Sequence, residues 1–164
     1  MTFRIGHGYD VHKLGGRGPL RLGGAVINET DGLCGHSDGD VLLHAILDAF
    51  LGALALGDIG QWFPDTDPAY EGTCSAWFAE QLLQSPQAGG WTISNIDSTI
   101  IAERPRLAPH ISRIRDSAAA VLGTDREAVS VKATTNEGMG FTGRGEGIAA
   151  YSVILLNSIP QQDS

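Results

Sequence analysis

The chain has 164 residues, 42% of them hydrophobic, and a formal net charge of −8. This length suits one domain with a substantial core, and the acidic balance argues against nucleic-acid binding, which needs a basic surface. No apolar run approaches the roughly 20 residues that span a bilayer, and strand-like sequence begins too early for a signal peptide. We therefore expect a cytoplasmic protein, independent of membranes, with one domain over residues 1–159 and a flexible tail over residues 160–164.

The first half of the chain predicts two strands and a long amphipathic helix. The strands span residues 4–13 and 20–27, and the Gly- and Pro-rich segment between them suits a hairpin loop. Residues 40–56 carry apolar side chains at helical spacing, with Gly57 in the position of a C-terminal cap. The irregular segment that follows, residues 57–72, has the length of a functional or mobile loop.

Helices and strands alternate in the second half. The expected elements are a helix over residues 73–85, a strand over 91–102, a helix over 109–122, and strands over 129–135 and 148–156 separated by a Gly-rich stretch over 137–147. This alternation implies helices packed on a sheet. The two cysteines, Cys34 and Cys74, are too few for a disulfide framework and are expected to be reduced.

Asp10, His12 and His44 form the first candidate site. Residues two apart in a strand point to the same face, so Asp10 and His12 should lie side by side. His44 lies in the expected helix with carboxylates four residues to either side, at Asp40 and Asp48, and such a carboxylate can orient an imidazole. Zinc uses two histidines and a carboxylate in catalytic sites, and iron or manganese use similar ligands. The alternative is that each is an ordinary surface or hydrogen-bonding residue.

The segment over residues 36–40, with the sequence HSDGD, lies directly before this helix. Ser37, Asp38 or Asp40 is expected to cap the helix N-terminus, which is the usual role of such residues. A helix N-terminus also attracts anions, so His36 beside it is a candidate for facing a phosphate. The segment by itself does not separate these two interpretations.

The polar segment over residues 132–137 leads from a strand into the Gly-rich stretch. Hydroxyl and N–H groups at a strand end can bind phosphate oxygens, and Glu137 is a candidate magnesium ligand. An ordinary strand terminus with turn-forming residues explains the segment equally well. The Gly-rich stretch lacks the Gly-Lys-Ser/Thr ending of a P-loop and precedes a strand instead of a helix, which argues against a P-loop and a dinucleotide-binding fold.

Six segments, taken together and in order, resemble one enzyme family. They are GHGYDVH at residues 6–12, HSDGDV at 36–41, GDIG at 57–60, FPDTD at 63–67, KATT at 132–135 and GFTGRGEG at 140–147. The family is that of 2-C-methyl-D-erythritol 2,4-cyclodiphosphate synthases, of the non-mevalonate pathway of isoprenoid biosynthesis. The resemblance extends over nearly the whole chain.

The resemblance implies a single domain of the α/β class (α+β type), similar to Bacillus chorismate mutase. Its mixed sheet would have four to five strands, with helices on one face. It also implies a homotrimer in which the sheets face the threefold axis and three active sites lie at the subunit boundaries. Arg144 and Glu146 match positions near that axis, where the family has an internal cavity for an isoprenoid-like ligand.

The reaction implied is that of a cyclising phosphorus–oxygen lyase. The 2-phosphate of 4-diphosphocytidyl-2-C-methyl-D-erythritol 2-phosphate attacks the β-phosphorus of its own diphosphate, and CMP leaves. The product is 2-C-methyl-D-erythritol 2,4-cyclodiphosphate. Such chemistry requires positioning and charge neutralisation more than a protein nucleophile. The sequence agrees, because it offers no Ser-His-Asp or Cys-His constellation.

The resemblance also assigns roles residue by residue. Asp10, His12 and His44 match zinc ligands, and Glu137 matches a residue that holds Mg²⁺ or Mn²⁺ between the substrate phosphates. His36 and Thr135 match the positions that stabilise the transition state and place the phosphates. The positions that match substrate contacts are Ser37, Asp58, Gly60, Phe63, Pro64, Asp65, Thr66, Asp67, Ala102, Pro105, Arg106, Leu107, Ala108, Thr134, Phe141 and Arg144.

Two other classes of protein are compatible with these residues. A metal-dependent nucleotide phosphodiesterase would use the same ions but transfer the phosphoryl group to water, which gives a linear product. A non-catalytic trimer that binds an isoprenoid or a nucleotide would not depend on His44 for its role. The cyclic or linear nature of the product separates the first alternative from a cyclase.

Overall fold

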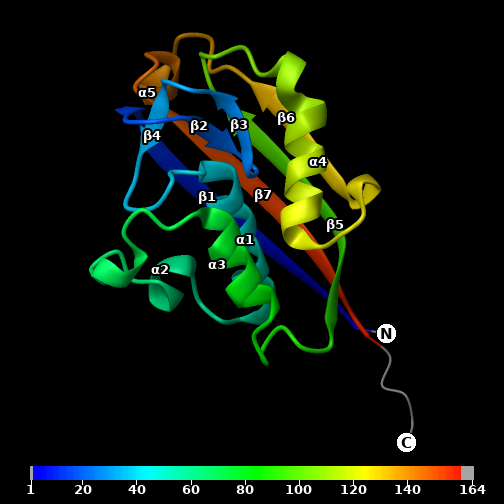
Figure 1. Cartoon of the computed structure of the whole chain (residues 1–164). Helices are drawn as coiled ribbons and strands as arrows, with labels where there is room; N and C mark the ends of the chain where they lie inside the picture. Colours follow the sequence, from blue (N-terminus) through cyan, green and yellow to red (C-terminus); the bar gives the residue numbers. More distant parts are fainter. Residues whose placement is uncertain (1, 160–164) are drawn as a thin grey trace, which may run out of the picture.

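A mixed five-stranded sheet, with the order β4-β1-β7-β5-β6, lies at the base of the computed structural model, which describes residues 2–159. Strands β5 and β6 run parallel, and the other neighbouring pairs are antiparallel. The first and last strands pair along almost their whole length, so the two ends of the described chain lie together (Figure 1). The strands are β1 (Phe3–Gly16), β4 (Gly32–Cys34), β5 (Trp91–Ile101), β6 (Val129–Thr134) and β7 (Gly147–Ser158).

Three helices cover one face of this sheet, as Figure 1 shows. They are α1 (Val41–Leu54), α3 (Ser75–Leu83) and α4 (Ile111–Leu122). Helix α1 is the central one, and ten of its 14 residues are buried. Under it lies β7, whose alternate residues from Ile148 to Leu156 are fully buried, the pattern of a central strand with one covered face. The predicted single α+β domain with a mixed sheet and helices on one face is confirmed.

Asp40 caps α1 and joins it to a neighbouring turn. Its carboxylate accepts hydrogen bonds from the Leu43 amide inside the helix and from the amides of Gly23 and Gly24. Of the three candidate caps only Asp40 is completely enclosed, and its carboxylate satisfies all three of these N–H groups. The expected C-terminal cap at Gly57 is wrong, since Ala55 takes the left-handed conformation, with φ of 57°, and ends the helix earlier.

The expected single strand over residues 20–27 is wrong in detail. It consists of two short strands, β2 (Leu20–Leu22) and β3 (Ala25–Asn28), that pair with each other as a separate sheet. Gly23 and Gly24 both have positive φ, 62° and 82°, which suits a two-residue hairpin turn. The expected hairpin between residues 4–13 and 20–27 is therefore also wrong, because β1 pairs with β4 and β7.

The long segment over residues 57–72 is ordered by its own short helices and by aromatic packing. It contains α2 (Ile59–Trp62) and the 3₁₀ turn η1 (Pro68–Tyr70). Phe63 packs against Tyr70, Trp77 and Phe78 with ring centroids 4.6 to 5.9 Å apart. The remaining short helices are η2 (Ala108–His110), η3 (Arg126–Ala128) and α5 (Gly140–Gly143). The expected tail over residues 160–164 lies outside the described residues.

Along β1 and β7, the face of the sheet opposite the helices carries large apolar side chains that are exposed. Along β1 and β7, the outward side chains of Phe3, Ile5, Tyr9, Tyr151 and Val153 are between 41% and 72% exposed. Tyr9 and Tyr151 stack across the strand pair with ring centroids 4.7 Å apart. Among residues 2–159, no helix has the length and apolar character that crossing a bilayer requires.

We predict that Gly8→Ala destabilises the fold severely, because a Cβ at Gly8 would lie 1.9 Å from the carbonyl oxygen of Ala45 in α1. Backbone cannot yield as a flexible side chain does, so we expect a loss of about 3 kcal/mol or more in the free energy of unfolding, measured by urea denaturation. Gly52→Ala is the matched control, since Gly52 lies on α1 and its Cβ would make only an ordinary 3.8 Å contact with the carbonyl oxygen of His7 on β1. Equal stability of the two variants would contradict the close approach of α1 to β1.

Candidate metal centre and adjoining cavity

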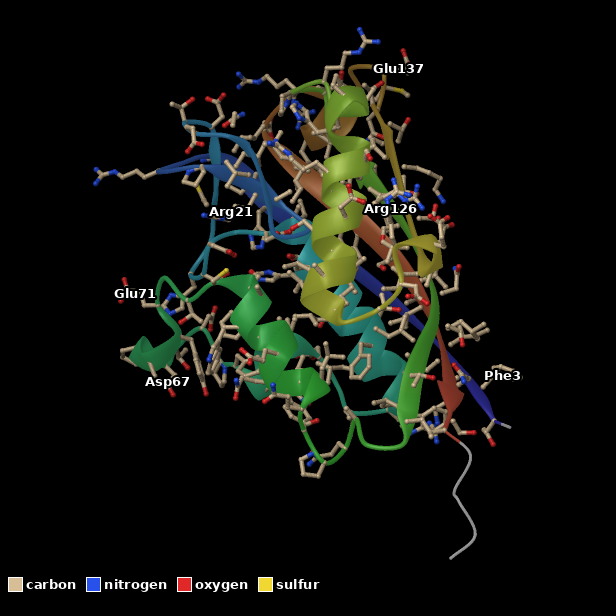
Figure 2. The ribbon with its side chains drawn as sticks, turned by 45° about the vertical axis from the view of Figure 1, so that its right-hand side comes forward. Phe3, Arg21, Asp67, Glu71, Arg126 and Glu137 are labelled. Atoms are coloured by element: carbon tan, nitrogen blue, oxygen red, sulfur yellow. The ribbon has the colours of Figure 1, made fainter. Side chains whose placement is uncertain are left out.

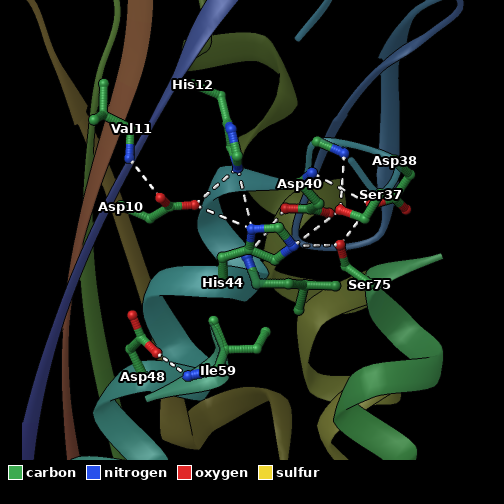
Figure 3. Close-up of polar contacts among 12 residues, drawn as sticks. Asp10, Val11, His12, Ser37, Asp38, Asp40, His44, Asp48, Ile59 and Ser75 are labelled. Atoms are coloured by element: carbon green, nitrogen blue, oxygen red, sulfur yellow. Dashed lines mark hydrogen bonds and ion pairs between the residues drawn. The ribbon is translucent and has the colours of Figure 1, made fainter. Parts of the chain in front are cut away.

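Asp10, His12 and His44 converge on one point beneath the helix layer. The first two point from β1 toward the helices, and His44 comes from the first turn of α1 (Figure 3). Asp10 Oδ2 lies 2.9 Å from His12 Nε2 and 3.1 Å from His44 Nδ1, and the two nitrogens are 3.1 Å apart. Within residues 2–159 this is the only His, Cys, Asp and Glu group with metal-ligand spacing.

The triangle of ligand atoms has the size that a tetrahedral ion needs. Zinc lies about 2.0–2.1 Å from nitrogen and oxygen ligands, so two ligands at the tetrahedral angle are about 3.3 Å apart. The three observed separations are close to that value. The side chains are also mostly buried, with 24% of Asp10, 18% of His12 and 13% of His44 exposed. The donor set therefore fits a divalent ion with one position left open.

Mutual attraction shifts the pKa values of Asp10 and His44. Burial by itself would raise the pKa of Asp10, but hydrogen bonds and charge attraction from His12 and His44 outweigh it and hold that pKa well below its usual range. Burial would lower the pKa of His44, yet the hydrogen bond to Asp10 and its negative charge raise it overall. The lowered pKa keeps the Asp10 carboxylate ionised, which favours a cation beside it.

The outer nitrogen of His44 contacts serines instead of the expected carboxylates. Nε2 lies 2.9 Å from Ser75 Oγ and 3.2 Å from Ser37 Oγ. The prediction that Asp40 or Asp48 orients the ring is wrong, because Asp40 caps α1 and Asp48 accepts a hydrogen bond from the Ile59 amide. Residues four apart share a helix face, but both carboxylates find backbone N–H partners first.

A cavity of about 290 Å³ opens beside the triad. His12 and His44 form part of its wall, together with the predicted contacts His36, Ser37, Gly60, Phe63 and Asp65. Ile59, Tyr70 and Phe78 complete the lining and give it an apolar side. The segment over residues 57–72 thus forms one wall of the space that a metal-bound ligand would occupy.

A second cavity, of about 490 Å³, contains another group of the predicted substrate contacts. It is lined by Ala102, Pro105, Arg106, Leu107, Ala108, Thr134 and Thr135, with Glu103, Ile111 and Ala133. Glu103 holds the turn at its edge, because its carboxylate accepts hydrogen bonds from the Asn136 and Gly138 amides. Glu137 lies in this turn with φ of 52°, and its side chain is exposed.

The two cavities lie apart within one chain. Asp10 is in register with Ala150, Ile100 and Ala133 across β1, β7, β5 and β6, so three strand spacings of ~4.8 Å, or about 14 Å, separate the triad from β6. In Figure 2, Glu137 lies at the top of the molecule, whereas Asp67, on the segment that forms one wall of the first cavity, lies at the lower left. The structure therefore puts His36 and Thr135 in different cavities.

Several predicted substrate contacts lie outside both cavity linings. Asp58 and Asp67 cap α2 and η1 through hydrogen bonds to the Gln61 and Ala69 amides. Pro64 and Thr66 are exposed on the same segment. On and after α5, Phe141 is exposed and Arg144 forms an exposed ion pair with Glu146, at a distance of 2.6 Å.

Sequence reasoning missed Ser75, Tyr70 and Phe78 as parts of this site. Ser75 is fully buried against His44, although it lies 31 positions away in the chain. No local pattern identifies it, because a serine beside a helix start is normally a cap. The aromatic residues have an apolar spacing that is equally typical of a core.

The fold and the site define a single-domain α+β protein with a three-ligand site for a divalent metal ion. The model of the YgbB family matches residues 3–157, and the chain belongs to this family. It is 55% identical over 154 residues to the 2-C-methyl-D-erythritol 2,4-cyclodiphosphate synthase of Syntrophotalea carbinolica, covering 94% of each chain.

Solved structures agree with this assignment. A CDP complex of IspF from Plasmodium falciparum has a TM-score of 0.81 and 35% identity, with 96% of this chain and 97% of that chain covered. The bifunctional IspDF of Campylobacter jejuni has a TM-score of 0.88 and 40% identity. This chain covers 43% of that longer protein, and 96% of this chain is matched.

We predict that Asp10→Asn lowers the pKa of His44 in the metal-free protein, because it removes the charge that raises that pKa. Asp10 contributes to the free energy of unfolding above the ordinary carboxyl pKa, and this contribution is lost as pH falls through the lowered pKa of Asp10. The contribution of His44 to the free energy of unfolding is complete below the ordinary imidazole pKa, and it is lost as pH rises through the raised pKa of His44. The variant should therefore lose about 1–3 kcal/mol of stability, most of all between about pH 4 and 6.5.

Urea unfolding with a chelator present, together with NMR titration of His44, measures both effects. Asp116→Asn is the control, since its pair with Arg126 is exposed on the helix side of the molecule and should contribute less than about 1 kcal/mol. An unchanged His44 pKa in Asp10→Asn would contradict the coupling.

Proposed function

We propose that this chain is a cyclising phosphorus–oxygen lyase that converts 4-diphosphocytidyl-2-C-methyl-D-erythritol 2-phosphate to 2-C-methyl-D-erythritol 2,4-cyclodiphosphate and CMP. The observation that carries the proposal is the convergence of Asp10, His12 and His44 beside a cavity, in a chain 55% identical to a synthase of this name. The CDP complex of a related structure supports a cytidine nucleotide as the ligand.

The reaction is an intramolecular displacement at phosphorus. An oxygen of the 2-phosphate forms a bond to the β-phosphorus while the bond from that phosphorus to the bridging oxygen breaks, and CMP departs with the bridging oxygen. Both reacting groups belong to one substrate, so the protein contributes by holding them in line. This requirement agrees with a cavity walled by His36, Ser37 and Gly60, which offers hydrogen-bond donors for the phosphates.

Asp10, His12 and His44 would hold Zn²⁺, and Glu137 together with the substrate phosphates would hold Mg²⁺ or Mn²⁺. When bound, these ions supply Lewis-acid polarisation of the diphosphate and neutralise its charge. The need for cations follows from the composition, because a net charge of −8 otherwise repels a polyanionic substrate.

The side chains and backbone of the two cavities would divide the substrate between them. His36 and Ser37 would donate hydrogen bonds to phosphate oxygens, and the apolar wall formed by Ile59, Phe63 and Phe78 would pack on the methylerythritol carbons. Backbone groups of residues 102–108 would recognise the cytosine, and Thr134 and Thr135 would donate to the nucleotide phosphates. The remaining predicted contacts, among them Asp58, Phe141 and Arg144, would act from the rims.

We further propose a homotrimer whose active sites form where the first cavity of one subunit meets the second cavity of its neighbour. Two observations support this arrangement. The halves of the proposed site are about 14 Å apart in one chain, and the outer face of β1 and β7 exposes neighbouring large apolar side chains that a partner subunit would bury. The same assembly would bring Arg144 and Glu146 near the axis, where an isoprenoid-like ligand would bind.

We predict that the purified protein releases CMP together with a cyclic diphosphate, and that His44→Ala abolishes both through loss of the metal. Phosphorus NMR of the product and metal analysis of the protein provide the measurements. Asp116→Ala, at an exposed ion pair with Arg126 on the helix side of the molecule and outside both cavity linings, should remain fully active. A linear diphosphate product would show instead a phosphodiesterase, and full activity of His44→Ala would refute the metal assignment.

We predict that two inactive variants restore activity when their subunits are mixed. His44→Ala damages the metal side and Thr135→Ala the nucleotide side, so a boundary can combine one intact half from each. Random assembly of equal amounts should recover about a quarter of the wild-type activity per site. The control mixes His44→Ala with the double variant, which supplies no intact metal side. No recovery in the first mixture, with mixed trimers verified by mass spectrometry, would place each site within one chain.

A further inference from the structure

The two ring nitrogens of His44 face different surroundings. Nδ1 points toward Asp10 and His12, whereas Nε2 points away from them, toward Ser75 and Ser37 (Figure 3). A neutral imidazole carries its proton on one nitrogen only, and a metal ligand must present the other as a lone pair. For His44 to bind a metal through Nδ1, the proton must therefore reside on Nε2.

A serine hydroxyl by itself does not select this tautomer, because it can donate as readily as it accepts. Ser75 has a second partner, however, since its hydroxyl also contacts Asp38 Oδ1. An ionised carboxylate only accepts, so the single hydroxyl proton of Ser75 is directed to Asp38. Ser75 Oγ then presents only lone pairs to His44, 2.9 Å from Nε2, and the ring must donate.

Ser37 does not have this property. Its Oγ lies farther from Nε2, at 3.2 Å, and accepts a weak hydrogen bond from the Gly39 amide at 3.4 Å. It also lines the cavity beside the triad, whereas Ser75 is completely buried. The hydroxyl proton of Ser37 therefore remains available to a ligand in the cavity.

Backbone hydrogen bonds hold Asp38 and Ser75 together against the ring. The Asp38 amide donates to the Thr73 carbonyl at 3.2 Å, and the Gly72 amide donates to the His36 carbonyl at 2.8 Å. These bonds join the segment before α1 to the segment before α3. The contact of Asp38 with His44, through Ser75, is thus built into the junction of two helix starts.

A gain in the stability of the fold does not explain why an aspartate lies at position 38. Its second oxygen, Oδ2, is buried without a hydrogen-bond partner among residues 2–159. Buried acceptors are normally paired, and an unpaired one destabilises the fold. It is also not the cap of α1, a role that Asp40 has. Its Oδ1 also accepts a weak hydrogen bond from the Asp40 amide at 3.3 Å, but its shortest side-chain contact is with the hydroxyl that faces His44.

We propose that Asp38 and Ser75 form a hydrogen-bond relay that fixes the tautomer and orientation of His44 and so prepares Nδ1 to bind the metal. Both are positioning residues, since neither touches the ion or the reacting atoms. The inference rests on the proposed metal site at Asp10, His12 and His44, and it assigns to that site two residues absent from the ligand set.

The test is Zn²⁺ binding by the metal-free protein, measured by titration against a competing chelator. We expect Ser75→Ala and Asp38→Ala each to weaken binding by about 10- to 100-fold, the usual effect of losing a residue that supports a metal ligand. The double variant should bind no more weakly than the worse single variant, because the two residues act as one unit. Ser98→Ala is the matched control: Ser98 is equally buried and bonded to Ser152, but lies in the sheet, and should bind like wild type.

A second measurement separates positioning from general damage. In the zinc-loaded wild type, the Nε2 proton of His44 should give a slowly exchanging signal in a proton–nitrogen NMR spectrum. Its protection should disappear in Ser75→Ala and decrease in Asp38→Ala, while Ser98→Ala retains it. Thermal unfolding of the metal-free variants monitors the fold, and Asp38→Ala, at a less buried position, carries the test if Ser75→Ala does not fold.

The outcomes distinguish failure of the proposed metal site from failure of the Asp38–Ser75 relay. If the wild type binds no Zn²⁺, the proposed metal site itself fails. If it binds and both single variants remain within twofold of it, the site stands and the relay is wrong. If only Ser75→Ala is affected, Asp38 does not direct the serine proton and the relay is also overturned.

Discussion

Helix α1 lies so close to β1 that side chains are sterically excluded at Gly6 and Gly8, where a Cβ would be within 2 Å of a helix carbonyl oxygen. This approach brings the first turn of α1 directly onto the strand that carries Asp10 and His12. Asp40 fixes the helix start by accepting hydrogen bonds from the Gly23–Gly24 turn as well as from the helix. The metal geometry depends on both, because an outward shift of the helix would separate His44 from its partners on β1.

The electrostatics of the protein follow from the same arrangement. A chain with a net charge of −8 cannot attract a polyanion through its overall field. It instead concentrates negative charge and two imidazoles in one enclosed place, where the depressed pKa of Asp10 shows how strongly a positive partner is favoured. Under the proposed function, bound cations change this acidic pocket into a site for phosphate.

The proposed division of the site between two cavities accounts for the exposed apolar side chains on β1 and β7, because two subunits would have to meet to complete one site. One cavity has the metal triad and the apolar wall, and the other has the backbone and hydroxyl groups suited to a nucleotide. The outer face of β1 and β7 bears exposed aromatic and aliphatic side chains that a partner surface would bury. In the proposed trimer, the interface and the active site would form together, so assembly would be a condition of catalysis and not an addition to it.

Local patterns in the sequence determined most elements, because periodicity and breaker residues act over short distances. The period of two placed Asp10 beside His12, and helical spacing placed His44 in α1. Local patterns gave wrong predictions where a segment had more than one possible pairing partner or more than one possible helix end. The Gly23–Gly24 turn formed its own hairpin, and Ala55 ended α1 before Gly57.

The tertiary structure alone decided which groups meet. Asp40 and Asp48 found backbone amides, which left His44 to Ser75, a residue 31 positions away. It also decided that His36 and Thr135 line different cavities. Such contacts depend on how helices and strands pack, and no spacing along the chain encodes a distance across the core.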